Sequence, residues 1–175
     1  GIDNQYYEGE ISYIPLALKA WWTIRLDALK ATNPLTGESY NIVENEFSIV
    51  DSATSGLSMP PNWWDDFMDS LEEQDLIEPY HGHLRILKTC DEENKAKLPT
   101  LTYVYNGIEF PLEGKDYVLE WDHDDGSKIC QLDLMRSDAQ FGQNPVKYIF
   151  TAGIPFMKKY YTIFDYENER VGFAL

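Results

Sequence analysis

Positively charged residues are scarce in this sequence. Its 175 residues include 14 Lys and Arg against 30 Asp and Glu, and the formal net charge is −16 at pH 7. A protein that binds the phosphate backbone of a nucleic acid, or an anionic membrane surface, needs a basic surface. The composition therefore argues against both kinds of partner.

Long hydrophobic runs are also missing. The longest stretch without a charged residue runs from Ser52 to Trp64, and it contains Pro60 and Pro61. Because a transmembrane helix needs roughly 20 consecutive apolar residues, no span is predicted. No signal peptide is visible, and since the chain begins at Gly1 without Met, we expect it to be processed or trimmed.

Cysteine is rare, with Cys90 and Cys130 as its two occurrences. Both could be buried thiols, or they could pair if the protein is secreted. Structural zinc sites use four ligands, so two cysteines alone do not indicate a metal site.

The three histidines give no strong metal motif. His81 and His83 could lie on one face of a strand, and candidates for a third ligand are Asp122, His123 and Asp124. Solvated loop histidines are the favoured interpretation, so neither a metal nor a cofactor is predicted. The segment 122–126 lacks the spacing of a calcium loop, and we interpret it as an exposed acidic hairpin tip.

Most of the remaining pattern predicts strands. Apolar or alternating runs bounded by turn residues predict strands at Ile11–Leu18, Trp21–Leu29, Phe47–Asp51, Leu101–Tyr105, Ile108–Leu112, Tyr117–Trp121, Lys128–Leu132, Tyr160–Phe164 and Val171–Ala174. Asn106-Gly107 and Asp125-Gly126 predict hairpin turns. One helix is predicted at Pro61–Leu71, where apolar residues recur at helical spacing. The predicted fold is a single mainly β domain with few short helices.

Asp51 follows an apolar strand directly, in the segment Ile49-Val50-Asp51-Ser52-Ala53-Thr54-Ser55. Burial makes a carboxylate costly to ionise, so hydrogen-bond donors from the hydroxylated residues or from turn amides are expected. The residues alone leave two interpretations open. Asp51 is either a functional carboxylate or an ordinary aspartate that begins a turn.

The Asp51 segment resembles the second active-site motif of pepsin-like aspartic proteases, Asp-Thr/Ser-Gly-Thr-Ser after two apolar residues. Further segments are similar to that family in the same order along nearly the whole chain. They are Gly1-Ile2-Asp3, Trp21-Trp22-Thr23-Ile24-Arg25-Leu26-Asp27, Leu98-Pro99-Thr100-Leu101, Asn106-Gly107, Phe156–Asp165 and Val171–Ala174. Several segments are most similar to plasmepsin-type and cathepsin D-type members.

The resemblance implies that residues 1–175 are the C-terminal lobe of the bilobal pepsin-like acid protease fold, without the N-terminal lobe. In that family each lobe gives one Asp to a dyad that activates water for peptide-bond hydrolysis. Asp51 would be the catalytic residue of this lobe, supported by Ser52 and Thr54. Substrate subsites would be lined by Trp21, Ile49 and Ala152.

The resemblance also implies a disulfide between Cys90 and Cys130, and with it a secretory, vacuolar, endolysosomal or extracellular location. The expected partners are the N-terminal lobe or another protein chain, and a peptide or protein substrate. We expect the face around Asp51, Trp21 and Phe156 to be exposed in this lobe, because it would meet the other lobe.

Two positions depart from the family pattern. Ala53 stands where the family nearly always has Gly, and Ile154 stands where it usually has Asp. Glycine lets backbone amides approach a carboxylate closely. These departures motivate an alternative, a catalytically inactive pepsin-like homologue that serves as a binding or structural subunit.

Overall fold

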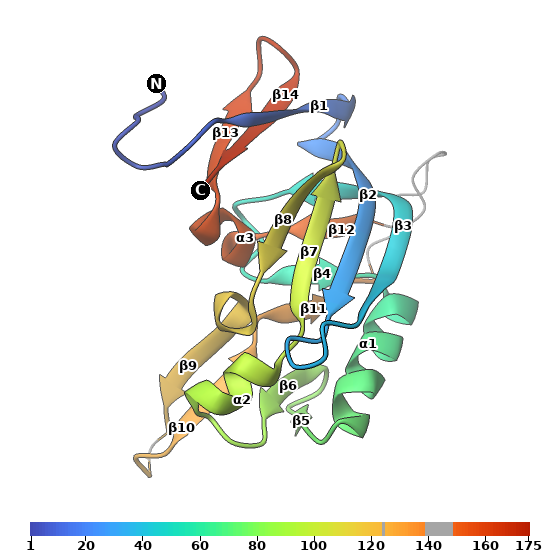
Figure 1. The fold of residues 1–175 in the computed structure, drawn as a ribbon, viewed down its shortest axis with the longest axis vertical. Helices are drawn as coiled ribbons and strands as arrows, with labels where there is room; N and C mark the ends of the chain where they lie inside the picture. Colours follow the sequence, from blue (N-terminus) through green and yellow to red (C-terminus); the bar gives the residue numbers. More distant parts are fainter. Residues whose placement is uncertain (124, 139–148) are drawn as a thin grey trace.

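The computed structural model describes residues 1–123, 125–138 and 149–175. These residues form a large β-sheet, a smaller sheet at one end of the molecule, and a few helices beside them (Figure 1). Both termini lie at the end opposite the smaller sheet. The mainly β fold expected from the sequence is confirmed.

Ten strands make up the larger sheet. They are β1 (Ser12–Leu18), β2 (Thr23–Thr32), β3 (Ser39–Val50), β4 (Leu57–Met59), β7 (Thr100–Tyr105), β8 (Ile108–Leu112), β11 (Leu134–Arg136), β12 (Ile149–Ala152), β13 (Tyr161–Asp165) and β14 (Arg170–Ala174). Their order is β11-β4-β12-β3-β2-β1-β14-β13, and β7 and β8 branch from β2. Most neighbours are antiparallel, but β12 runs parallel to β3 and β11 runs parallel to β4.

The smaller sheet has the order β5-β6-β10-β9. Its strands are β5 (Ile77–Tyr80), β6 (Leu84–Leu87), β9 (Val118–Asp122) and β10 (Lys128–Leu132). The last three residues of β9 are exposed, so this sheet contributes less to the core than the larger one.

The predicted hairpins are confirmed. In the turn between β7 and β8, Asn106 and Gly107 have φ angles of 52° and 74°. Two successive left-handed residues are what a tight two-residue turn requires, and Asn-Gly accepts that conformation at little cost. The pairs β9–β10 and β13–β14 are antiparallel as expected.

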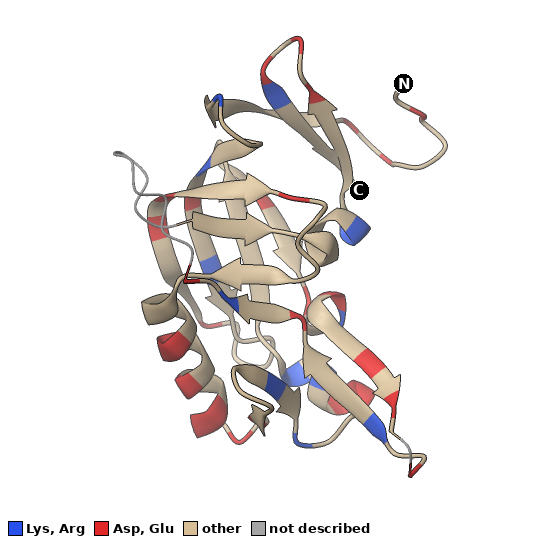
Figure 2. Ribbon diagram, turned by 180° about the vertical axis from the view of Figure 1, so that it is seen from behind, with Lys and Arg blue, Asp and Glu red and all other residues tan. Residues whose placement is uncertain are grey.

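Helix α1 (Pro61–Glu73) confirms the one helix predicted from the sequence. Its buried residues are those of the apolar face, Trp64, Phe67, Met68 and Leu71. The acidic residues of α1 lie on the outside, where Figure 2 shows a row of them along the helix. Three further helices were not predicted because each is at most six residues long: α2 (Glu92–Lys97), α3 (Ile154–Lys159) and the 3₁₀ helix η1 (Gly114–Tyr117).

An aromatic cluster lies at the centre of the core. Phe156 of α3 has its ring 5.1 Å from that of Phe173 and 5.4 Å from that of Tyr103, and its relative exposure is 0%. The expectation that Phe156 belongs to an exposed face is therefore wrong. The reason is that α3 turns this side chain inward, against rings from β7 and β14.

Candidate active site

Asp51 lies where two parallel strands end side by side. It follows β3 directly, and its backbone N–H donates to the carbonyl oxygen of Ala152, the last residue of β12, at 3.2 Å. The carboxyl ends of neighbouring parallel strands therefore meet at this residue. The segment that follows, residues 51–56, is called the Asp51 turn below.

Both carboxylate oxygens of Asp51 accept a hydrogen bond from the same turn. The Ala53 backbone N–H donates to Oδ1 at 2.9 Å, and the Thr54 hydroxyl donates to Oδ2 at 2.7 Å. Ser52 is exposed, and within the described residues no hydrogen bond joins its side chain to Asp51. One donor on each oxygen fixes the plane of the carboxylate.

Close backbone contacts hold the Asp51 turn against the start of α3. A Cβ atom built on Gly153 would lie 2.2 Å from the Gly56 carbonyl oxygen and 2.5 Å from that of Thr54. The Ile154 N–H donates to the same Thr54 oxygen at 3.0 Å. Position 153 therefore requires glycine, because the two chain segments leave no room for a side chain.

Ala53 does not conflict with the geometry of the turn. Its amide reaches Asp51, and its φ is outside the left-handed region that favours glycine. The side chain is exposed, so the methyl group points into no packed neighbour within this lobe. Within the lobe, the backbone N–H of alanine at position 53 supports the Asp51 carboxylate as well as the N–H of a glycine would.

An open pocket of about 690 Å³ extends from Asp51. Trp21, Trp22, Ile49 and Ile149 provide much of its apolar lining, and Thr54, Ser58 and Thr151 add hydroxyl groups. Trp21 is 62% exposed. A half-buried carboxylate beside large apolar side chains forms a site that can take an extended chain with hydrophobic side chains.

The structure brings most of the predicted site residues together. Asp51, Thr54, Trp21 and Ile49 all line the pocket. Ala152 has 0% relative exposure and is not among the lining residues, because alternation along β12 directs it into the core and its neighbour Thr151 into the pocket. Ala152 contributes instead the carbonyl that fixes the Asp51 amide.

Sequence reasoning missed the residues of the pocket that come from β11 and the segment after it. They are Met135, Arg136, Ser137 and Asp138. The Arg136 guanidinium donates through one nitrogen to both carboxylate oxygens of Asp138, at 2.7 and 2.8 Å. A three-residue strand carries no detectable periodicity, so the sequence held no signal that these residues would reach Asp51.

Asp133 is a buried carboxylate at the junction of β10 and β11. It is 6% exposed, and its backbone carbonyl accepts a hydrogen bond from the Leu57 N–H at 2.9 Å. Burial raises the pKa of Asp133 to about 6, against a weaker opposing effect of Lys158. Its Oδ1 would lie 2.8 Å from a Cβ built on Gly56, so this carboxylate packs directly under the end of the Asp51 turn.

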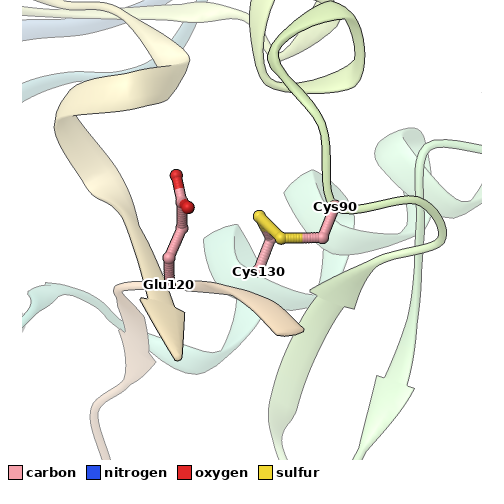
Figure 3. Close-up of side chains that lie close together, drawn as sticks. All are labelled: Cys90, Glu120 and Cys130. Atoms are coloured by element: carbon pink, nitrogen blue, oxygen red, sulfur yellow. A yellow bond between two sulfur atoms is a disulfide. The ribbon is translucent and has the colours of Figure 1, made fainter. Parts of the chain in front are cut away.

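Cys90 and Cys130 form a disulfide, with their sulfur atoms 2.13 Å apart. The bond joins the segment before α2 to β10, as the family resemblance implied. Figure 3 shows Glu120 beside the two sulfurs, and these three residues are the one group of metal-ligand type in the described part of the chain. Because the sulfurs are bonded to each other and Lys95 donates to the Glu120 carboxylate, the group has no free thiolate to offer a metal.

Within the described residues, no histidine belongs to a group of side chains that could hold a metal ion. His81 and His83 belong to the exposed turn between β5 and β6, which confirms the favoured interpretation that they are solvated loop histidines. His123 lies at the exposed tip of the β9–β10 hairpin, as interpreted, and Asp124 lies outside the described residues.

No helix in the described ranges is both long and apolar enough to cross a bilayer.

Comparison with known proteins places this chain beside aspartyl proteases, both by a family model and by similar sequences. The family model described as eukaryotic aspartyl protease matches residues 1–175. Plasmepsin I of Plasmodium falciparum is 35% identical over 175 residues, which cover 100% of this chain and 34% of plasmepsin I. Gastricsin of Mus musculus is 31% identical over 174 residues, covering 99% of this chain and 40% of gastricsin. Cathepsin D of Clupea harengus is 30% identical, with the same two coverages.

The chain thus spans well under half of the length of these relatives.

Proposed function

The chain belongs to the eukaryotic aspartyl protease family, and on that basis we propose that residues 1–175 are the C-terminal lobe of an aspartic endopeptidase. In this proposal Asp51 is one of two carboxylates that activate water to hydrolyse a peptide bond in a peptide or protein substrate. The second carboxylate comes from an N-terminal lobe or another protein chain. The observation that carries the proposal is the Asp51 carboxylate, which has one donor on each oxygen and lines an open, largely apolar pocket.

The proposed chemistry depends on a pair of carboxylates that shares one proton. Two carboxylates a few ångströms apart cannot both ionise cheaply, so the pair holds a single proton across the acid range. The charged member takes a proton from water, whose oxygen bonds to the peptide carbonyl carbon, while the other member protonates the carbonyl oxygen. The C–N bond then breaks as the amide nitrogen gains a proton, which leaves a carboxylic acid and an amine.

The residues around Asp51 have separate roles in this proposal. Thr54 and the Ala53 amide orient the carboxylate and support its charge. Ser52 supports Asp51 as part of the backbone of the turn, and not through a hydrogen bond from its side chain. Trp21, Ile49 and Thr151 contact substrate side chains. Ala152 is assigned a positioning role, through the hydrogen bond between its carbonyl and the Asp51 amide.

The inactive homologue remains the competing hypothesis, motivated by Ala53 and Ile154. The hydrogen bond from the Ala53 amide to Asp51 favours the active form, because the support expected from the usual glycine is present. The Ile154 amide binds the Thr54 carbonyl, but any residue other than proline would make this backbone bond, so it does not separate the two hypotheses.

A cleavage assay separates the two hypotheses. The intact protein that carries this chain is incubated with an acid-denatured protein substrate between pH 3 and 8. We expect cleavage with an acid optimum, and its loss in Asp51→Asn, since asparagine keeps the shape of aspartate but cannot take a proton. Circular dichroism should show an unchanged fold for this variant.

Asp69→Asn is the matched control, because Asp69 lies on the exposed side of α1. It should keep the activity of the parent protein. Absence of acid cleavage in a preparation with both lobes and both carboxylates would favour the binding or structural subunit.

We also propose a secretory, vacuolar, endolysosomal or extracellular location. The Cys90–Cys130 disulfide supports it, because disulfides persist mainly in oxidising compartments.

A further inference from the structure

A second pocket, of about 500 Å³, lies beside the one that contains Asp51. It is formed where the β1–β2 turn meets the β13–β14 turn. The residues that matter for its chemistry are Lys19, Trp21, Trp22, Tyr166, Glu167 and Glu169. None of them comes from the Asp51 turn.

The two turns that form this pocket are joined to each other. The Leu16 N–H donates to the Glu169 carbonyl oxygen at 2.8 Å, and the Lys19 ammonium forms an ion pair with the Glu169 carboxylate at 2.6 Å. Trp21 and Glu169 have φ angles of 46° and 52°, which are costly for residues other than glycine. The contacts between the turns hold both residues in these conformations, so the walls of the pocket are fixed in relation to each other.

The charge balance of the pocket is negative. Lys19 neutralises Glu169, but Glu167 has neither an ion pair nor a hydrogen bond among the residues that the structure describes. One carboxylate is therefore in excess, in a chain whose net charge is −16. Both the local and the overall field favour a cation here.

Exposed aromatic rings line the same pocket as this carboxylate. Trp21 is 62% exposed and Tyr166 is 84% exposed. The faces of such rings attract ammonium and guanidinium groups, and tryptophan does so most strongly. Aromatic walls together with an unpaired carboxylate match a lysine or arginine side chain, whose apolar stem can lie on the rings while its charged end reaches Glu167.

Trp21 and Trp22 line both pockets. A polypeptide bound across Asp51 can therefore continue past these two tryptophans into the second pocket. We propose that this pocket binds a lysine or arginine side chain of the substrate polypeptide and so selects substrates with a basic residue on one side of the cleaved bond. This proposal rests on the proposed function, since it takes the occupant of the Asp51 pocket to be a polypeptide.

Peptide binding to the intact protein, carrying Asp51→Asn to prevent cleavage, tests the proposal. The probes are ten-residue peptides with two central phenylalanines and one lysine, which is moved through the other positions; matched peptides carry norleucine instead. At one lysine position we expect a Kd about fivefold lower than for the norleucine peptide, the effect of a cation–π contact plus an exposed ion pair. High salt should reduce this ratio.

Additional variants locate the effect. Glu167→Gln should lower the ratio of the two Kd values to about twofold, the share left to the cation–π contact, whereas Glu73→Gln, which removes an exposed carboxylate from the far end of α1, should leave it unchanged. Equal Kd values for lysine and norleucine peptides at every position, or a lysine preference that Glu167→Gln leaves undiminished, would overturn the proposal. Acid cleavage without any preference for lysine would contradict the role proposed for the second pocket and leave the proposed protease function standing. Absence of acid cleavage together with a lysine preference in binding would contradict only the protease function.

Discussion

The smaller sheet and the Asp51 turn are stabilised by different kinds of interaction. In the smaller sheet, where β9 is largely exposed, the Cys90–Cys130 disulfide ties β10 to the segment before α2. The buried Lys95 of α2 adds an ion pair to Glu120 of β9. A covalent bond and an ion pair thus add to the packing of a sheet whose edge strand β9 is largely exposed.

The Asp51 turn has no such cross-link. Its position follows from the parallel pairing of β3 with β12, the two hydrogen bonds to the carboxylate, and the contact between Gly56 and Gly153. The contrast indicates that the lobe adds covalent stabilisation where an edge strand is exposed, and uses close backbone contact where a functional group must be oriented.

Removal of the disulfide should destabilise the smaller sheet. In Cys90→Ala with Cys130→Ala we expect the free energy of unfolding to fall by about 4 kcal/mol, since the bond closes a long loop in the unfolded chain. Urea unfolding gives the change, and hydrogen exchange shows where it acts. Faster exchange should appear first in β9 and β10, and the double variant should no longer respond to dithiothreitol. Equal loss of protection in β3 would contradict the contrast.

A methyl group at position 153 should disturb the Asp51 turn. Gly153→Ala places a Cβ 2.2 Å from the Gly56 carbonyl oxygen, so one of the two segments must move, at a cost of about 2–3 kcal/mol. Unlike the disulfide variant, this one should lose peptidase activity at temperatures where it is still folded. Thermal unfolding and cleavage rates measured on the same samples check the prediction, and full activity at unchanged stability would refute it.

Asp133 lies between the two regions and should make stability depend on pH. Burial raises its pKa to about 6 in the folded protein from 3.8, so the folded state holds a proton that the unfolded state releases. Its contribution is therefore most favourable below about pH 4 and is lost as the pH rises to 6.

In Asp133→Asn the unfolding free energy should rise by about 1–2 kcal/mol at pH 7 relative to the parent protein, with little change at pH 4. Urea unfolding at the two pH values measures this difference. The exposed Asp69→Asn serves as control, and an identical effect of Asp133→Asn at both pH values would exclude a titration of Asp133.

The smallest effect is expected at Ala53. Because its amide already binds Asp51 and its φ is not left-handed, Ala53→Gly should change kcat/KM by less than about threefold. The added backbone freedom of glycine should lower stability by up to about 1 kcal/mol. Steady-state kinetics and urea unfolding give the two values, and a large gain in activity would mean that the methyl group obstructs the reaction.

The sequence predicted the features that depend on neighbouring residues. Strong local signals were Asn106-Gly107 for a hairpin and the spaced apolar residues of α1. Strand β3 is longer than predicted, because its first half, from Ser39, is mostly exposed and shows no apolar run. Strands β4 and β11 were missed because three residues are too few for a periodic pattern.

The part of the candidate site that consists of neighbouring residues could also be predicted. Asp51 and Thr54 belong to one short motif, so their contact could be anticipated. Arg136 and Ile149 reach the pocket through strand pairings with distant parts of the chain, which composition and spacing do not reveal. The inward direction of Ala152 depends on the register of β12 in the same way.

The parallel pairing of β3 with β12 has a consequence for the order of folding. Phe47 pairs with Ile149, so about 100 residues must be brought into a loop before this contact can form. Contacts of such large sequence separation form late and slow the folding of a domain, whereas the β7–β8 hairpin can form within microseconds. Asp51 should therefore acquire its orientation among the last steps of folding of this lobe, after β12 has been synthesised.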